Sequence, residues 1–297
     1  MIAQLGIVGV GMVGASIAAA AVTHAGISRV VGYSPGEDAQ HAQAAGWLQR
    51  VCEDAPSCLE GSDLVILAAP VGAIAAMLPS LAERLSQMEA AGVPLPHLSD
   101  TGSSKQSIVA SADRALGRYR ARFLPAHPIA GSERSGAGAA HADLFVDRNV
   151  LFCDNGKVGA DTIQLLTGFW EKLGARVASI DPAEHDALYA EVSHWPHAAA
   201  FALCLGIGRG PHAAQSLLRA GAGLRDTTRI AASDGKLWSD IILSNREQTL
   251  ASAHRHLSAL AAIVAAIEND DRKALCALLE EAAAWRSHLH ENPIDNR

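Results

Sequence analysis

The chain has 297 residues, of which 49% are apolar and 19% are charged, a balance that is typical of a folded protein and excludes a disordered one. Its net charge of −7 comes without a basic stripe, so we expect no nucleic-acid partner. The length is sufficient for two domains.

The chain carries five cysteines, an odd number, and none of them forms a C-x-x-C pair. This pattern predicts free thiols and a reducing, cytoplasmic compartment. The N-terminus lacks a basic region followed by a long apolar run, and no uncharged apolar stretch is long enough to cross a bilayer. We therefore expect a soluble protein without a membrane partner.

The first predicted strand, Ile2–Val8, leads into a G-x-G-x-x-G motif and then into a predicted helix, Ala15–Val22. In such a motif the first glycine permits a tight turn, the second lets a pyrophosphate approach the backbone, and the third lets the helix pack against the strand. The order of these elements predicts a dinucleotide cofactor with its phosphates at the helix N-terminus. The alternative is a tight turn without a ligand. The cofactor-binding candidates in this motif are Gly9, Gly11, Met12, Val13 and Gly14.

The second predicted strand, Arg29–Tyr33, ends without the acidic residue that usually receives the adenosine ribose 2′-hydroxyl. Ser34 stands there, while Glu37 and Asp38 lie beyond the strand tip. The missing acid removes a repulsion against a 2′-phosphate, yet no arginine follows to neutralise one. NAD and NADP are therefore both candidate cofactors, and Ser34 is either a ribose contact or a plain turn residue.

Two further predicted strands bring small side chains to the same edge of the sheet. Asp63–Ala69 is followed by Pro70 and Val71, which we expect beside the cofactor, although Val71 suits the core equally well. Leu98–Asp100 is followed by Ser103, which could hold a substrate hydroxyl or the nicotinamide. The helices expected between these strands are Ala39–Gly46 and Ile74–Met88.

The spacing around Ser103 also suits helix N-capping, and on spacing alone the cap is the favoured interpretation. Lys105 lies near the start of the next predicted helix. On its own it is best explained as a solvated helix residue.

The predicted strand Arg122–Ala126 delivers the segment His127–Glu133. Pro128, Gly131 and the nearby Gly136 predict a loop with a specified shape. An imidazole titrates near neutral pH, so His127 is a candidate for moving a proton, the alternative being a turn cap.

Asn149–Cys153 and Ala175–Ile180 are expected to complete the sheet, with the helix Thr162–Leu173 between them. The alternation of strands and helices predicts an α/β, doubly wound, Rossmann-type parallel sheet in residues 1–181. From Pro182 onward the strand signals stop, which predicts an all-helical second domain, residues 182–297, with a bend at Pro196. The helices expected there are Ala183–Ile207, Ala213–Leu218, Lys236–Glu247, Gln248–Glu268 and Arg272–Glu291.

Two segments of the helical domain carry candidate ligand-binding groups. His194 and His197 are three residues apart and share roughly one helical face, but no Glu or Cys completes a metal site, so we expect no metal. Arg225 and Arg229 are four apart and could clamp an anion. On these residues alone, a solvated helix with Asp226 paired internally is the favoured alternative.

Taken in order, these motifs resemble those of the prephenate/arogenate dehydrogenase family. The resemblance runs from residue 2 to about residue 240 and so covers most of the chain. The chain departs from the family at Ser34, at Arg225, where lysine is common, and at Trp195, where leucine is usual. Besides G-x-G-x-x-G, the matching segments are Asp100-x-Gly102-Ser103-x-Lys105, His127-Pro-x-Ala-Gly-Ser-Glu133, Leu144-Phe145, His185-Asp186, Ser193-His194-x-Pro196-His197 and Arg225-Asp226-x-Thr228-Arg229 followed by Trp238.

The resemblance implies an NAD(P)-dependent oxidoreductase of tyrosine biosynthesis that needs no metal. Such an enzyme converts prephenate to 4-hydroxyphenylpyruvate and carbon dioxide, or arogenate to tyrosine. It implies that His127 accepts the substrate hydroxyl proton, that Ser103 holds the same hydroxyl and that Arg229 pairs with a substrate carboxylate. It also implies a homodimer formed by the helical domain. The remaining residues implied to bind, orient or gate the substrate are His197, Arg225, Glu133, His194, Asp226 and Trp238.

The main alternative is a β-hydroxyacid dehydrogenase, which shares a Rossmann unit and a helical second domain. That class uses a lysine of the second domain for proton transfer, whereas no lysine lies between Lys172 and Lys236 here. Two further alternatives are a sensor that binds the dinucleotide without turnover and a helical interaction module attached to a Rossmann domain.

Overall fold

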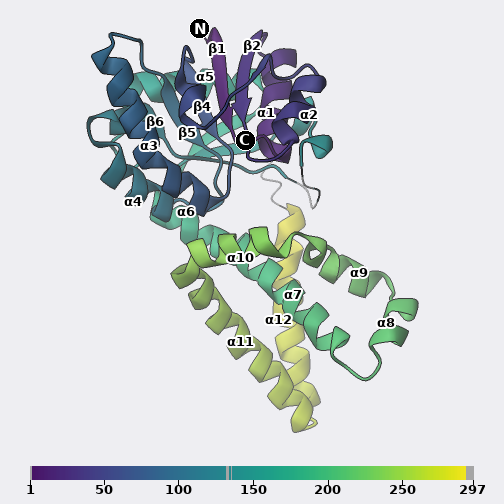
Figure 1. Cartoon of the computed structure of the whole chain (residues 1–297). Helices are drawn as coiled ribbons and strands as arrows, with labels where there is room; N and C mark the ends of the chain where they lie inside the picture. The colour runs from purple at the N-terminus through teal and green to yellow at the C-terminus, as the bar shows by residue number, and fades with distance from the viewer. Residues whose placement is uncertain (1, 132–133, 135, 292–297) are drawn as a thin grey trace. The chain divides into compact units, whose positions relative to one another are not determined.

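The computed structural model describes residues 2–131, 134 and 136–291 (Figure 1). By its internal contacts the chain divides into two compact units, residues 1–246 and 247–297. The boundary that the sequence places between residues 181 and 182 stays a prediction.

The first unit is built on a six-stranded parallel sheet with the strand order β3-β2-β1-β4-β5-β6 (Figure 1). Its strands are β1 (Gln4–Val8), β2 (Arg29–Tyr33), β3 (Arg50–Val51), β4 (Leu64–Leu67), β5 (His97–Asp100) and β6 (Phe123–Leu124). The α-helices of this region are α1 (Met12–Thr23), α2 (Asp38–Ala44), α3 (Val71–Ala90), α4 (Gln106–Ala115) and α5 (Ala160–Lys172). Its short 3-10 turns are η1 (Pro56–Leu59), η2 (Gly117–Arg122), η3 (Ala137–Ala139) and η4 (Ala142–Phe145). The prediction of a doubly wound, Rossmann-type α/β sheet is confirmed.

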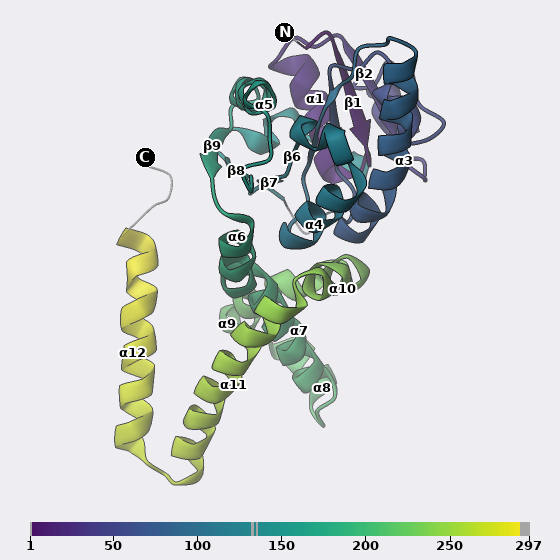
Figure 2. The ribbon, with the colours of Figure 1, turned by 90° about the vertical axis from the view of Figure 1, so that its left-hand side faces the viewer.

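Both faces of the sheet are buried, because alternate strand residues point to opposite sides. On one face Leu5 and Ile7 of β1 join a core formed with α1, α2 and α5. On the other face Val65 and Leu67 of β4 join a core formed with α3 and α4, and Figure 2 shows α1 and α3 on either side of the sheet. Strands buried on both faces read as continuous apolar runs, which is why the sequence revealed them.

The last predicted strands do not complete this sheet, so that expectation is wrong. Instead β7 (Ala126–Pro128), β8 (Asn149–Phe152) and β9 (Arg176–Ser179) form a separate three-stranded sheet in the order β7-β8-β9. Strands β7 and β8 are antiparallel, and β8 and β9 are parallel. The predicted strand Arg122–Ala126 is thus split into β6 and β7 at Pro125, which has no N–H to donate to a ladder.

The segment that starts at His127 begins as a strand and not as a loop. His127 and Pro128 belong to β7, where His127 is paired in register with Leu151 of β8. The sequence missed this because Pro128 argues against a strand, while β7 tolerates it as an edge strand. His127 is consequently held by a ladder on one side.

The helical part of the first unit starts at Asp181, whose Oδ1 accepts hydrogen bonds from the N–H groups of Ala183 (2.8 Å) and Glu184 (3.2 Å). The expected disturbance at Pro196 is present as a π-helical turn that directly precedes α7. The elements are α6 (Pro182–Tyr189), the π-helical turn η5 (Ala190–His194), α7 (Trp195–Gly208), α8 (Ala213–Arg219), α9 (Ala222–Thr228), the 3-10 turn η6 (Arg229–Ala232) and α10 (Gly235–Ser244).

The second unit consists of α11 (Arg246–Glu268), which begins at the end of the first unit, and α12 (Arg272–Glu291). Among the described residues, one helix, α11, is long and apolar enough to cross a membrane, judged by length and composition alone. A single such helix does not establish a membrane protein. Both helices leave apolar side chains exposed. These are Leu250, Leu257, Leu260, Val264 and Ile267 on α11, and Leu279, Trp285 and Leu289 on α12.

Candidate active site

The glycine motif forms an open cradle at the end of β1. Gly9 adopts φ +90°, and a Cβ on it would lie 2.4 Å from the carbonyl oxygen of Ala68. A Cβ on Gly14 would lie 1.9 Å from the carbonyl oxygen of Gly9, whereas a Cβ on Gly11 would meet no atom within 4 Å. No acidic residue occupies the first turn of α1. The turn, the close packing and the free space in front of a helix N-terminus therefore fit a dinucleotide pyrophosphate.

The other cofactor candidates lie at the carboxyl edge of the same sheet or close to it. Ser34 follows β2 directly, and Pro70 precedes the first residue of α3. Val71 is only 4% exposed and packs in the core with α3 and α4, so little of it faces a ligand. Met12 and Val13 open α1 and are partly buried against the core.

Lys105 is completely buried, so its interpretation as a solvated residue is wrong. Its Nζ donates hydrogen bonds to Oδ2 of Asp100 (2.6 Å) and to the carbonyl oxygen of Ala126 (2.7 Å). Asp100 is equally buried. A charged side chain is buried only when it is paired, and here the pair joins the end of β5 to the start of β7.

The N-terminus of α4 is capped by Asp186 of α6 and not by Ser103. Oδ1 of Asp186 accepts from the N–H of Lys105 (2.7 Å), and Oδ2 accepts from the N–H of Gln106 (2.9 Å). The helix has no cap from its own adjacent side chains, so the capping interpretation of Ser103 is wrong. A carboxylate at this position satisfies orphan N–H groups and complements the helix dipole. Ser103 lies in the turn before this helix and is partly exposed.

His127 lies at one end of a chain of hydrogen bonds that runs through α6. Its Nδ1 shares a hydrogen bond of 2.8 Å with Nε2 of His185, and Nδ1 of His185 shares one of 2.8 Å with Oδ1 of Asp186. The ring of Tyr189 stacks on His185 (centroids 4.5 Å apart) and meets the His127 ring edge to face (4.9 Å). Within the described part of the chain, no hydrogen-bond partner is found for Nε2 of His127.

Burial is the main cause that lowers the pKa of His127 well below 6.5, and the neighbouring His185, Lys105 and His194 act in the same direction. The pKa of His185 is also lowered, first by burial, while its hydrogen bond to Asp186 opposes the shift. Burial raises the pKa of Tyr189 to about 12. At neutral pH both histidines are therefore uncharged and Tyr189 keeps its proton.

His194 sits in the π-helical turn and is almost fully buried. Its Nδ1 accepts a hydrogen bond of 3.1 Å from Nδ2 of Asn245, which also donates to the carbonyl oxygen of Asp186 (2.7 Å). Its Nε2 is buried without a partner among the described residues. Burial is the largest cause that lowers the pKa of His194 to about 4. The ring is thus neutral and carries its proton on Nε2, and a backbone interaction with Ser103 opposes the lowering of its pKa.

His197 and Trp238 stack on each other, with ring centroids 3.4 Å apart and planes 16° from parallel. Nδ1 of His197 donates to the carbonyl oxygen of Ser193 (2.9 Å). Burial is the largest cause that lowers the pKa of His197, and the charge of Arg229 adds to it. The turn η6, which begins at Arg229, packs against α7. The structure therefore brings together three of the predicted substrate-binding residues, from α7, α10 and η6.

The two predicted arginines and Asp226 are exposed, and one further candidate lies outside the described residues. Arg225 and Asp226 are exposed on α9, and Arg229 is exposed at the start of η6. Both α9 and η6 pack against α7, which carries His197. Glu133 lies outside the described residues.

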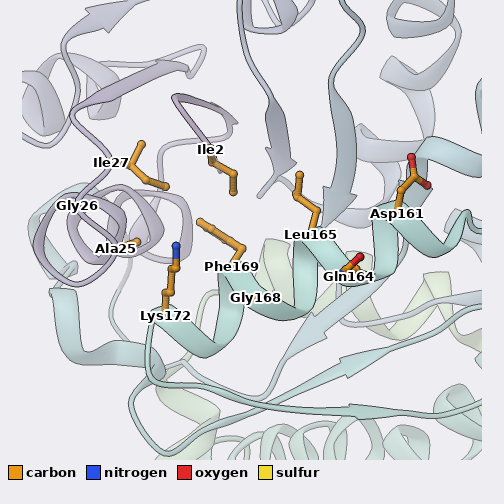
Figure 3. Close-up of a pocket in the computed structure, with 10 residues that line it drawn as sticks. All are labelled: Ile2, Ala25, Gly26, Ile27, Asp161, Gln164, Leu165, Gly168, Phe169 and Lys172. Carbon is orange, nitrogen blue, oxygen red and sulfur yellow. The ribbon is translucent and has the colours of Figure 1, made fainter.

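A cavity of about 550 Å³ lies elsewhere (Figure 3). It lies between the start of β1, the α1–β2 turn and one face of α5, where Ile2, Ile27 and Phe169 line it. It is therefore at the amino ends of the parallel strands, whereas ligands of such sheets bind at the carboxyl ends. Among the described residues no group of three or more His, Cys, Asp or Glu side chains is placed to hold a metal ion.

Several members of the site escaped the sequence interpretation. Asp186 caps a helix that begins 80 residues earlier, and Asn245 contacts His194 from 51 residues away, so no local sequence pattern predicts either contact. Ser104 likewise shares a hydrogen bond with Ser244 (2.8 Å). Their one sequence signal is the His185-Asp186 pair, an adjacent base and acid that matches a family motif but carries no predicted role.

A Rossmann-type sheet with an open glycine cradle, and neutral histidines held at the same sheet edge, define a dinucleotide-dependent dehydrogenase. Residues 18–179 match the family model described as prephenate dehydrogenase, nucleotide-binding domain, and residues 181–281 match that described as prephenate dehydrogenase, dimerization domain. The chain belongs to the prephenate dehydrogenase family. It is an oxidoreductase of that family, and the alternative classes are not favoured.

Relatives of known sequence and structure agree with this assignment. The chain is 30% identical to cyclohexadienyl dehydrogenase of Zymomonas mobilis over 96% of each chain. It is also 30% identical to prephenate dehydrogenase of Bacillus subtilis, covering 95% of this chain and 74% of that one. Prephenate dehydrogenase of Aquifex aeolicus, solved with hydroxyphenyl propionate and NAD+, superposes with a TM-score of 0.84 at 27% identity, covering 97% of this chain and 99% of that one.

Proposed function

We propose that the chain catalyses the NAD(P)-dependent oxidative decarboxylation of prephenate to 4-hydroxyphenylpyruvate and carbon dioxide, of arogenate to tyrosine, or of both. One observation carries the proposal: His127 is held in its neutral form at the sheet edge, with Nε2 free of protein partners among the described residues. The relatives named above support the substrate class. Production of reduced cofactor from each substrate tests it.

The hydrogen-bond chain fixes which nitrogen of His127 can accept a proton. Asp186 accepts two backbone N–H bonds, so its third bond is best explained as accepted from Nδ1–H of His185. This leaves Nε2 of His185 as an acceptor, and Nδ1–H of His127 as its donor. Nε2 of His127 then carries the lone pair. A carboxylate that orients one imidazole therefore prepares a second imidazole as a general base.

The chemistry needs a hydride acceptor, which the nicotinamide cofactor supplies. His127 accepts the proton of the 4-hydroxyl as the C–H bond breaks, so that no cationic oxygen develops. Loss of the ring carboxylate as carbon dioxide makes the ring aromatic. The proton then returns to the phenolate oxygen, and His127 ends the cycle neutral, as it began.

The substrate carries carboxylates, and the cationic and donor groups of the helical part are suited to them. We assign a substrate carboxylate to Arg229, with Arg225 and His197 toward the side chain. The buried Nε2–H of His194 offers a further donor, and Trp238 orients His197 by stacking. Ser103 is assigned to the substrate hydroxyl, while the roles of Glu133 and Asp226 rest on the family resemblance.

Replacing Arg229 with alanine is expected to raise the Michaelis constant of the substrate by about ten- to a hundredfold, because a charge-assisted hydrogen bond contributes about 1.5–3 kcal/mol. Steady-state kinetics at saturating cofactor measure the effect. Arg219→Ala removes an exposed arginine at the end of α8 and is the matched control. A fall in turnover at an unchanged Michaelis constant would show that Arg229 does not bind the substrate in its ground state.

Replacing Asp186 with asparagine is expected to lower turnover by about a hundredfold or more, because the amide no longer fixes the tautomers of His185 and His127. Cofactor affinity should stay within about threefold of the original value, since no cradle residue is changed. Glu184→Gln, at an exposed carboxylate of the same helix, is the control. Equal turnover of the Asp186 variant and the unchanged chain would exclude the hydrogen-bond chain from the mechanism.

We further propose that NAD is the preferred cofactor. Strand β3 runs parallel to β2, and the N–H of Cys52 donates to the carbonyl oxygen of Gly32 (2.8 Å). Glu53 lies two residues beyond β3, at the same carboxyl edge of the sheet at which Ser34 follows β2. A carboxylate thus follows the adjacent strand, although none stands at the tip of β2.

The ends of β2 and β3 are acidic as a whole. No lysine or arginine lies between Arg29 and Arg50. Asp38 is already engaged, since its Oδ1 accepts from the N–H of Ala137 (2.9 Å). A 2′-phosphate would meet negative charge here, whereas a 2′-hydroxyl can donate to it. The four carboxylates of this edge are Glu37, Asp38, Glu53 and Asp54.

Titration calorimetry is therefore expected to give a dissociation constant at least about tenfold lower for NAD+ than for NADP+, a difference of about 1.4 kcal/mol. Glu53→Gln should reduce the difference between the dissociation constants of NAD+ and NADP+. Arg134, the arginine nearest in sequence to the Asp38–Ala137 contact, serves as the control, and Arg134→Ala should leave the ratio unchanged. Tighter binding of NADP+ that disappears in the Arg134 variant would overturn the assignment.

Membership of the family also supports proposals for the assembly, the compartment and the domain boundary. We propose a homodimer formed by the helical region, because exposed apolar residues on α11 and α12 suit a second copy and the matching family model is a dimerization domain. Five free thiols suit a reducing cytoplasm. The two family models meet between residues 179 and 181, which supports a boundary at 181 and 182.

A further inference from the structure

We propose that the buried ion pair of Lys105 and Asp100 is a positioning device that fixes the strand carrying His127 against the carboxyl edge of the parallel sheet. This inference deepens the proposed function, because it concerns the group assigned as the general base. Lys105 touches neither substrate nor cofactor in this proposal. It acts through Ala126, the residue before His127.

The pair holds both backbone polar groups of Ala126. Oδ1 of Asp100 accepts from the N–H of Ala126 (3.3 Å), and Nζ of Lys105 donates to its carbonyl oxygen (2.7 Å). Oδ2 of Asp100 also accepts from the N–H of Gly102 (2.7 Å) and from Nζ of Lys105 (2.6 Å). One carboxylate and one ammonium therefore tie together the end of β5, the Gly102 turn and the start of β7.

These hydrogen bonds satisfy backbone groups that a neighbouring strand would otherwise satisfy. β7 is an edge strand of the three-stranded sheet, and Ala126 turns its N–H and carbonyl away from β8 toward the ion pair. Pro125 has ended the parallel ladder one residue earlier. Buried backbone groups need partners, and here two side chains supply them at the junction of the two sheets. The position of His127 thus depends on the pair.

Stability alone does not explain a buried ion pair, since apolar residues of similar volume are often as stabilising. The charge of Lys105 also affects the pKa of the neighbouring histidines. The groups that face His127 are His185 and Tyr189 of α6, His194 of the π-helical turn, and the Lys105–Asp100 pair. Of these, the charge of the Lys105 ammonium lowers the pKa of both His127 and His185. The pair therefore helps to keep the base unprotonated.

Lys105→Met keeps most of the volume and removes the charge. We expect turnover to fall about a hundredfold, because small displacements of a catalytic group are costly, with Michaelis constants and the NAD+ dissociation constant within about threefold of the original values. Since the lysine charge lowers the pKa of His127, its loss raises that pKa. The acid limb of kcat/KM then moves to higher pH. Lys157→Met breaks an exposed ion pair with Asp113 and is the control.

Lys105→Arg keeps the charge but not the geometry, so it should lower turnover while leaving the acid limb in place. NMR of histidine-labelled full-length protein, recorded over a range of pH, measures the pKa of His127 directly and needs no turnover. Lower melting temperature in Lys105→Met, with an unmoved His127 titration and normal turnover, would reduce the pair to a structural role and overturn the inference. If the protein without substitutions turned over neither substrate, the proposed function would be refuted. The NMR titration would still test whether the ion pair positions His127 and lowers its pKa.

Discussion

His127→Asn is expected to lower turnover by about a hundred- to ten-thousandfold, the range that a positioned general acid–base group contributes. The Michaelis constants should change little, because the substrate is assigned to other residues. Asparagine retains a polar group toward His185 but cannot accept the hydroxyl proton. Steady-state and single-turnover kinetics with the purified full-length protein measure the loss.

The pH dependence supplies an independent check on this assignment. Because the pKa of His127 lies well below 6.5, the base is already neutral at pH 7, and kcat/KM should stay level from neutral pH into mild acid. It should then fall as His127 gains a proton. His212→Asn changes an exposed histidine that precedes α8 and should leave both turnover and this profile intact. Near-normal turnover in the His127 variant would remove it from the mechanism.

Gly14→Ala and Gly11→Ala are expected to fail in different ways. A Cβ on Gly14 would lie 1.9 Å from the backbone oxygen of Gly9, and backbone cannot yield as a flexible side chain does. We expect this variant to lose about 3 kcal/mol or more of unfolding free energy, at the upper end of the cost of overpacking, and with it cofactor binding. The melting temperature should drop by several degrees.

The Gly11 variant tests the cradle without disturbing the fold. A Cβ there meets no atom within 4 Å, and φ −71° suits alanine, so the melting temperature should stay unchanged. The same Cβ enters the space assigned to the pyrophosphate, so the dissociation constant for NAD+ should rise. If Gly11→Ala bound NAD+ as tightly as the unchanged chain, the phosphates would not lie at this helix N-terminus.

Local patterns predicted the parallel sheet and the glycine cradle. β1, β2 and β4 consist mainly of apolar residues, and the G-x-G-x-x-G motif follows the first of them, so neighbouring residues contain the whole signal. Which sheet a strand joins is not a local property. Pro125 diverts the chain so that β7 pairs with residues of β8 that lie 22 or more positions later, and no periodicity distinguishes this outcome from one larger sheet.

The sequence identified individual residues of the site, but it could not predict the contacts between them. His127 and His185 are 58 residues apart, and the Asp186 cap joins elements 81 residues apart. Lys105 was misjudged because lysine is usually exposed, and its burial follows only from Asp100 and Ala126 lying beside it. Sequence patterns identify chemical groups, whereas tertiary packing decides which of them meet.

The most direct measurement follows the absorbance of reduced nicotinamide when purified full-length protein is given prephenate or arogenate, each with NAD+ or NADP+. We expect turnover of at least one of the two substrates, faster with NAD+ than with NADP+. The ratio between the substrates would establish which ring compound is preferred. No turnover in any of the four combinations, from protein that is folded and binds NAD+ in calorimetry, would contradict the proposed function.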